Sequence, residues 1–220
     1  MELRFITKTV VYGCPSRDDS AWSLSGPDHG GWQLASPATV QAFFGDDPGR
    51  VRRFQSYLRA QYLGVFLIRG GQWICYGWCS QPQGVGPPHL PRWCGRLRAY
   101  WIFGCHTHTS FRNRGFYKQL LCELTRLIRQ REMRAEIFID THINNAASRK
   151  GILASGFEPR GVATTYRGWA PLMGSYVLAG KWRRQEAHPE IGVEIQNVPS
   201  GALAGGAPIS RSTSLKNSAR

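Results

Sequence analysis

Apolar and polar residues alternate along the start of the chain with a period of two, which predicts a strand over residues 1–12. Gly, Ser, Asp and Pro dominate residues 13–32 and predict a loop. Helical spacing follows, with Ser36 as a suitable N-cap and Pro37 in the first turn. Beyond it, a Gly70-Gly71 turn joins two apolar runs into a hairpin. The predicted helices are 36–44 and 48–62, and the hairpin strands are 64–69 and 72–80.

The second half of the chain predicts four more strands and two more helices, after a Pro/Gly-rich loop at 81–91. In the longer helix the apolar residues share one face. In the shorter one Gly156 fits the position just past the helix end. The strands are predicted at 96–109, 135–141, 162–168 and 175–182, and the helices at 116–132 and 144–157. Residues 186–220 have no apolar period, so we expect one domain over 1–185 and a disordered tail after it.

The composition adds a strong positive charge to this pattern. The 220 residues include 28 Lys and Arg against 14 Asp and Glu, which gives a net charge of +14. Such a charge favours an anionic partner. The basic residues are scattered and form no run of five or more, so an arm dedicated to nucleic acid is not indicated, and nucleic acid stays a partner that is open but not favoured.

Cysteine usage and hydropathy bear on the compartment. Six cysteines are too few for a disulfide scaffold in a chain of this length. The first residues lack the apolar segment of a signal peptide, and no stretch approaches the ~18 apolar residues of a membrane span. We therefore expect a cytoplasmic protein with reduced thiols and no membrane contact.

The stretch TSFRNRGFYKQLL, residues 109–121, combines a basic turn with the start of the longer helix. Gly115 lacks the Cβ that would block a phosphate, and a helix N-terminus carries a partial positive charge. Arg112 and Arg114 add charge beside it. Neither a Walker A loop nor a dinucleotide fingerprint is present. On these local features, a phosphate site and a basic turn before a core-packed helix both stay open.

Two motifs taken together resemble the GNAT superfamily of acyl-CoA-dependent N-acyltransferases. In the second, the family has an Asn on the following strand-to-helix connection and a Gly-Phe that closes the next helix. Here Asn145 stands eleven residues before Gly156-Phe157. The first motif is the family's Arg/Gln-x-x-Gly-x-Gly/Ala turn, which here reads Arg112-Asn113-Arg114-Gly115-Phe116-Tyr117. The resemblance covers residues 60–182, most strongly 100–157.

The resemblance implies an α/β (α+β) fold with a mixed, mostly antiparallel sheet of six to seven strands flanked by helices. Two central parallel strands, 96–109 and 135–141, would splay apart to admit the pantetheine arm of acetyl-CoA. The residues implied in cofactor binding are Thr107 along the pantetheine, Arg112, Asn113, Arg114, Gly115, Phe116 and Tyr117 around the pyrophosphate, and Asn145 and Ser148 near the thioester.

Two positions depart from the family pattern. Tyr117 occupies the Gly/Ala position of the turn, where its side chain either crowds the pyrophosphate or only starts the helix. Many members also place a Tyr seven residues after the Asn, as the acid that protonates the leaving thiolate, and here that residue is Ile152. The acid must come from elsewhere, with Ser148, water or a tail-loop residue as candidates.

Attack by an amine needs a general base with a pKa near the working pH. His106 and His108 share one face of the strand where the thioester would arrive, and they are the first candidates. Asp140 and His142, at the end of the next strand, are the second. The cysteines do not show zinc-ribbon spacing, so we expect no metal site.

The sequence therefore predicts an acyl-CoA-dependent N-acetyltransferase that acts on a primary amine of a small molecule, such as an amino sugar or a biosynthetic intermediate. Two alternatives stay open. The net charge suits a protein, peptide or aminoacyl-tRNA acceptor, and Ile152 in the place of the acid suits a non-catalytic CoA-binding module. A homodimer is also left open.

Overall fold

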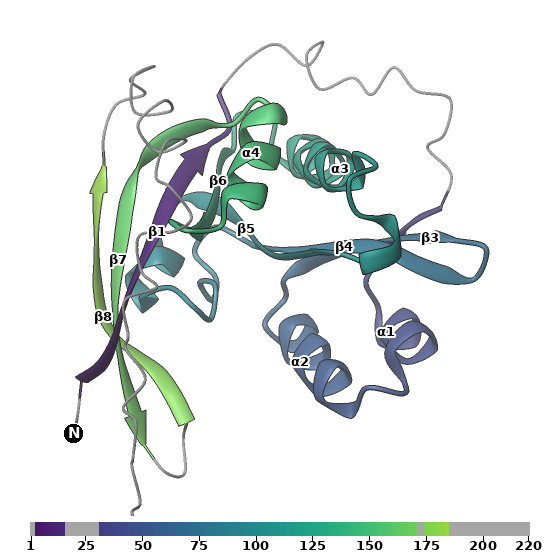
Figure 1. Cartoon of the computed structure of the whole chain (residues 1–220), viewed down its shortest axis with the longest axis horizontal. Helices are drawn as coiled ribbons and strands as arrows, with labels where there is room; N and C mark the ends of the chain where they lie inside the picture. Colours follow the sequence, from purple (N-terminus) through teal and green to yellow (C-terminus); the bar gives the residue numbers. More distant parts are fainter. Residues whose placement is uncertain (1–2, 16–30, 171–173, 185–220) are drawn as a thin grey trace, which may run out of the picture.

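The computed structural model describes residues 3–15, 31–170 and 174–184, and the elements follow one another as in Figure 1. The strands are β1 (Leu3–Gly13), β2 (Trp32–Leu34), β3 (Leu63–Arg69), β4 (Gln72–Ser80), β5 (Ala99–Thr107), β6 (Glu136–His142), β7 (Glu158–Ala170) and β8 (Gly174–Arg184). The α-helices are α1 (Pro37–Phe44), α2 (Pro48–Arg59), α3 (Phe116–Arg131) and α4 (Ala146–Ala154). Two 3₁₀ turns, η2 (Arg92–Arg96) and η3 (Thr109–Phe111), flank β5.

The strands form one eight-stranded sheet in the order β2-β3-β4-β5-β6-β1-β7-β8. Every neighbouring pair is antiparallel except β5 and β6, which run parallel. The sheet bends sharply at this parallel pair, so that β3 and β4 point away from the arm formed by β1, β7 and β8 (Figure 1).

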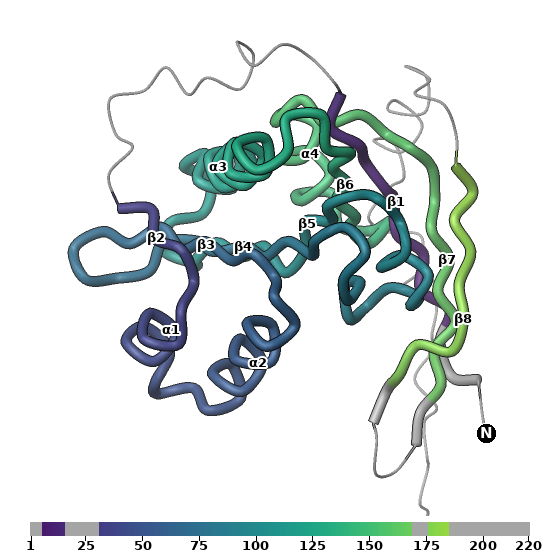
Figure 2. Tube along the Cα trace, turned by 180° about the vertical axis from the view of Figure 1, so that it is seen from behind, coloured from purple at the N-terminus to yellow at the C-terminus, as the bar shows by residue number. Residues whose placement is uncertain are grey.

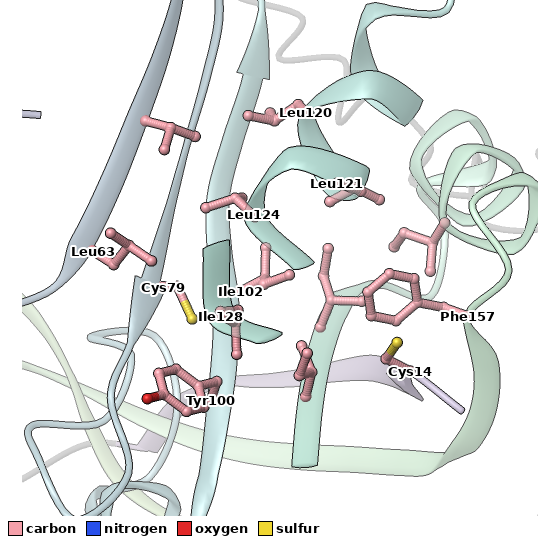
Figure 3. Packing of buried hydrophobic residues seen from close by; sticks show 14 of the residues in the cluster. Cys14, Leu63, Cys79, Tyr100, Ile102, Leu120, Leu121, Leu124, Ile128 and Phe157 are labelled. Carbon is pink, nitrogen blue, oxygen red and sulfur yellow. The ribbon is translucent and has the colours of Figure 1, made fainter. Parts of the chain in front are cut away.

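Helices cover the sheet on two faces, and the core divides in the same way. Helices α3 and α4 lie on one face, and α1 and α2 lie on the opposite face below β3 and β4 (Figures 1 and 2). Leu120, Leu121 and Leu124 of α3 pack against Ile102 of β5 in the first cluster (Figure 3). A second, aromatic cluster fills the α1/α2 face, and a smaller third one includes Trp101 and lies near η2.

Local sequence signals explain the helix starts and the hairpin. The Ser36 hydroxyl accepts a hydrogen bond from the backbone N–H of Thr39, which completes the capping box that begins α1. Asp47 caps α2 in the same way. Gly70 and Gly71 both have positive φ, of 55° and 75°, as a tight turn between β3 and β4 requires.

Most predicted elements are confirmed, with three differences. The sheet has eight strands rather than six to seven, because β2 forms at the end of the predicted loop 13–32 and pairs with β3. The strand predicted at 96–109 begins only at Ala99, because η2 occupies the residues before it. The last two strands are longer than predicted, because they pair from Gly161↔Arg184 to Ala170↔Gly174 as an antiparallel ribbon. The predicted tail at 186–220 lies outside the described residues.

Candidate functional site

The parallel strands β5 and β6 separate part-way along their length. They pair only from Ala99↔Glu136 to Ile102↔Ile139, after which β5 stays with β4 and β6 stays with β1. The cause is a bulge in β5, where Gly104, with φ +60°, and Cys105 together oppose one residue of β4. The bulge turns β5 away from β6, and the two strands open a wedge at their carboxyl ends.

Within the described part of the chain, the wedge leaves the edge of β5 that faced β6 without a sheet neighbour from residue 103 to 107. An extended ligand with amide groups can pair with such an edge as an added strand would. Thr107 ends this edge, and its buried hydroxyl has no hydrogen-bond partner within the described part of the chain. The Thr107 carbonyl accepts a hydrogen bond of 3.4 Å from Nε of Arg112. The pantetheine position predicted for Thr107 thus lies beside the wedge.

The turn before α3 is open on the outside. Gly115 has φ +79° and ψ −2° at the helix start, and no side chain caps the first turn. A Cβ added at Gly115 would meet no heavy atom within 4 Å. Asn113 also has positive φ, of 60°, and Arg112 and Arg114 are exposed beside it. First-turn N–H groups lack intrahelical partners, so the turn offers donors, positive charge and room for an anion.

Helix α4 begins on the same side of the wedge. The Asn145 side chain accepts a hydrogen bond from the backbone N–H of Ser148 at 3.1 Å and so caps the helix. The Ser148 hydroxyl in turn lies 3.0 Å from the Tyr117 hydroxyl. Ile152 is fully buried in the core between α4 and the sheet. The structure therefore brings Asn145, Ser148 and Tyr117 together and keeps Ile152 away from the site.

Solved structures share this fold. An acetyltransferase of the GNAT family from Colwellia psychrerythraea superposes with a TM-score of 0.53 at 14% identity, over 80% of this chain and 58% of that chain. A putative GNAT-family acetyltransferase from Novosphingobium aromaticivorans gives 0.51 at 13% identity, over 75% and 65%. The chain has the GNAT fold.

The likeness is one of structure and not of sequence. A scan against protein-family models found no match, and a search of curated proteins found none. The chain spans 58% and 65% of the length of the two GNAT structures. The pairing of β5 and β6 confirms the prediction that strands 96–109 and 135–141 form a central parallel pair and then separate.

Tyr117 does not crowd the turn of this GNAT fold. Its ring lies against Gly151 of α4, where an added Cβ would come within 2.6 Å of a Tyr117 ring carbon. Burial raises the pKa of Tyr117 far above its usual range, the nearby Cys105 and Asp140 raise it further, and the hydrogen bond with Ser148 lowers it. The phenol thus keeps its proton, and its hydroxyl is within electrostatic reach of one residue from each separating strand.

The histidines predicted as bases lie on the opposite face, toward α1. The His106 ring stacks on Tyr76 with 5.5 Å between centroids, and its pKa is lowered by burial and then by the positive charges of Arg112, Arg50 and His108. His108 sits edge-on to Trp73 at 4.7 Å. Its Nδ1 accepts a hydrogen bond from the backbone N–H of the 3₁₀ turn η3. His106 is therefore largely neutral at pH 7.

His108 and Trp73 also belong to a pocket of about 360 Å³ at the turn of the β3–β4 hairpin. Its lining combines aromatic, amide and hydroxyl groups from three segments of the chain. The lining residues are Ala42, Phe43, Gly71, Gln72, Trp73, His108 and Ser110. The aromatic cluster extends from Phe103, where the wedge begins, to Trp73, and the pocket lies at the Trp73 end.

Asp140 has a partner that the sequence did not reveal. Its carboxylate is 1% exposed and lies 3.0 and 3.1 Å from Nε2 of His89, and it accepts a hydrogen bond of 2.8 Å from the Trp101 indole. His89 comes from the Pro/Gly loop 81–91, 51 residues before Asp140. Only the isolated His in a proline-flanked loop signalled it. His142 is exposed, and its Nδ1 accepts a hydrogen bond from the turn that follows β6.

The remaining aromatic residues and the cysteines belong mostly to the core. Trp78, Tyr100 and Trp101 are buried in the core, whereas Trp73 is only partly buried. All six cysteines are free. Within residues 3–15, 31–170 and 174–184, no group of three or more His, Cys, Asp or Glu is placed to hold a metal, and no helix is long and apolar enough to cross a membrane.

Proposed function

We propose that the protein is an acyl-CoA-dependent N-acyltransferase that transfers an acetyl group from acetyl-CoA to a primary amine of a small molecule by direct attack. The observation that carries this proposal is the wedge between β5 and β6, which opens beside the Gly115 turn. A slot for an extended amide-bearing arm and a site for its phosphates thus lie side by side.

The chain offers suitable groups along the whole length of acyl-CoA. The N–H groups from Arg114 to Tyr117 would hold the pyrophosphate, with Arg112 and Asn113 beside them, because an uncapped helix start attracts phosphate. The edge of β5 that ends at Thr107 would pair with the pantetheine amides. Asn145 and Ser148 would lie near the thioester. Bound there, acyl-CoA supplies an activated acyl group.

The hydroxyls of Tyr117 and Ser148 would take the place of the family's Tyr acid, whose position is occupied here by Ile152. The two hydroxyls are 3.0 Å apart on the α3/α4 side of the wedge, and burial keeps the pKa of Tyr117 high, so the phenol is protonated at neutral pH. A positioned and protonated hydroxyl donates a hydrogen bond to a developing thiolate. Because the pKa of Tyr117 lies far above the working pH, it would pass a proton to the thiolate only as it receives one from the attacking amine. This pair also argues against a purely non-catalytic CoA module.

The opposite side of the wedge would receive the amine. Loop 81–91 borders that side and is tied down, because the Tyr62 hydroxyl donates to the Gly86 carbonyl at 2.7 Å and His89 pairs with Asp140. A fixed loop favours a small acceptor over a macromolecule. His106 and His108 stay proposals for the base, and the neutral state of His106 suits that role.

Two measurements test the proposal. Calorimetry with coenzyme A should show binding at a single site. A thiol-release assay with acetyl-CoA should then show turnover that depends on a primary amine, tested with butylamine, benzylamine, glycinamide and glucosamine. Coenzyme A binding without turnover on any of these amines would leave a binding module, and the absence of coenzyme A binding would overturn the proposal altogether.

A further inference from the structure

His89 lies where the two central strands part. Its ring centroid is 6.3 Å from that of Phe103, the first residue of β5 beyond the last pair with β6. Its Nε2 is 3.0 Å from the carboxylate of Asp140, the first residue of β6 beyond the same pair. One imidazole therefore contacts the first unpaired residue of both strands, on the face opposite α3 and α4.

The Asp140 carboxylate is held as an anion in spite of its burial. Burial by itself raises the pKa of Asp140, but the charge and hydrogen bond of His89 and the hydrogen bond from the Trp101 indole lower it below its usual value. A buried carboxylate that has ordered donors is a fixed negative charge. It orients the imidazole through Nε2, as carboxylates orient histidines in other acid–base sites.

The other ring nitrogen of His89 is the one available for chemistry. The side chain is 35% exposed, and no described residue makes a hydrogen bond to its Nδ1. Burial lowers the pKa of His89, and the positive charge of Arg167 lowers it too, but the charge and hydrogen bond of Asp140 outweigh both, so the net shift is upward. The groups that face the imidazole are thus Asp140, Arg167 and the uncharged ring of Phe103.

We propose that His89 is the general base that takes a proton from the acceptor amine, with Asp140 as its positioning residue. This inference rests on the proposed acyl transfer. Nδ1 of His89 takes one proton from the acceptor ammonium, and the neutral amine forms a C–N bond with the thioester carbonyl carbon while the C–S bond breaks. The second amine proton goes to the thiolate through the Tyr117 hydroxyl, and His89 releases its proton to water, so the products are an amide, coenzyme A thiol and one proton.

The position of His89 distinguishes it from the histidines on β5. His106 directly follows the bulge and its ring stacks on Tyr76, and His108 lines the pocket at the hairpin turn. The aromatic cluster, which includes Trp78 and Phe103, lies between them and loop 81–91. A base at His89 takes protons beside the wedge, whereas a base at His106 requires the acceptor to reach across that cluster.

The test uses the whole chain, with acetyl-CoA and the best amine of the four-member panel. We expect His89→Gln, whose amide can still donate to Asp140, to lower kcat/KM for the amine by about 10²–10⁴-fold. Its affinity for coenzyme A should stay within about twofold of the parent. Val85→Ala is the matched control, because it alters an exposed residue of the same loop.

The pH profile separates catalysis from a structural role. The parent kcat/KM should rise with pH through the pKa of His89, and this limb should vanish in His89→Gln. Asp140→Asn removes the charge that raises that pKa, so its limb should move to lower pH with a lower plateau; this variant decides the matter if His89→Gln does not fold.

Each outcome assigns the failure to one proposal. A parent protein that acylates no amine of the panel overturns the proposed function and the base with it. An active parent whose limb survives in His89→Gln, or disappears instead in His106→Gln or His108→Gln, overturns the role of His89 alone.

Discussion

The two faces of the wedge are built in different ways. On the α3/α4 face, the residues proposed for the pyrophosphate and the thioester come from two short segments, 112–117 and 145–148, each at the start of a helix. On the opposite face, His89 and Asp140 are 51 residues apart and meet only because a loop folds over the end of β6. The first face depends on local backbone geometry, and the second depends on tertiary packing.

The strongest way to break this comparison is to place a negative charge on the first face. Two like charges about 4 Å apart near a protein surface repel by about 4 kcal/mol, which is more than a hundredfold in affinity. We therefore expect Gly115→Asp to raise the Kd for coenzyme A by at least about 100-fold in calorimetry. Acylation of the amine should be lost in this variant only because the cofactor no longer binds.

Two controls isolate the charge at Gly115. Gly115→Asn has nearly the same shape and tolerates positive φ, so its Kd should change only several-fold. Gly70→Asp places the same charge at another glycine with positive φ and no atom within 4 Å of an added Cβ. Equal losses in Gly115→Asp and Gly115→Asn would mean that backbone strain, and not an anion site, governs the turn.

The Tyr117 hydroxyl gives a sharper view of the same face. Tyr117→Phe keeps the ring against Gly151 and removes only the group that contacts Ser148. We expect kcat to fall by about 10²-fold, at the lower end of the contribution of a general acid, with the Kd for coenzyme A unchanged. The measurement is steady-state turnover with thiol release.

Ser148→Ala is the partner variant for this test. It removes the other hydroxyl but leaves Asn145 able to cap α4, because the cap bonds to the backbone N–H of Ser148. A smaller loss than in Tyr117→Phe is expected. Full activity in Tyr117→Phe would show that the thiolate takes its proton from water.

The local backbone geometry of the α3/α4 face could be predicted from the sequence for a physical reason. A positive φ at Gly115 and a cap at Asn145 are properties of a few consecutive residues, and the sequence motif carries them. The sequence left open whether Tyr117 crowds the pyrophosphate or only starts the helix, and the missing information was its contact with Gly151, a residue of another helix.

The contact between His89 and Asp140 and the strand β2 could not be predicted from local sequence patterns. His89 lies in a loop whose composition predicts only a turn, and its contact with Asp140 depends on how the loop packs. The three-residue strand β2 is likewise set by its neighbour β3 and not by its own pattern. Sequence reasoning placed the base at His106 and His108 because they adjoin the motif, and that role stays a prediction.

The net charge of the chain allows a smaller test of the first face. Arg114 is exposed beside the open turn. We expect Arg114→Ala to raise the Kd for coenzyme A about three- to tenfold at low salt, an effect that should fade toward 1 M salt, where the Debye length is about 3 Å. Arg92→Ala, an exposed arginine of η2, is the control. Equal effects of both variants would mean that the overall charge of +14, and not the turn, attracts the ligand.

The smallest expected effect concerns stability on the second face. The pKa of Asp140 is lowered in the folded protein, so its contribution is present above the unfolded pKa of about 3.9 and is lost as pH falls through the folded value. The pKa of His89 is raised, so its contribution is present below the unfolded pKa of about 6.5 and is lost as pH rises through the folded value. The ion pair therefore stabilises the fold most strongly between these two limits.

Thermal melts of the parent and His89→Gln should show this directly. The Tm difference between them should be largest near pH 5.5 and should shrink by about 2–4 °C toward pH 8.5, the shift that about 1 kcal/mol produces in a domain of this size. His142→Gln removes an exposed imidazole from the same strand and should show no such trend. A Tm difference that does not change with pH would mean that His89 and Asp140 are held by a neutral hydrogen bond. The base on the second face would then lack the carboxylate charge that tunes it, while the cofactor face would be unaffected.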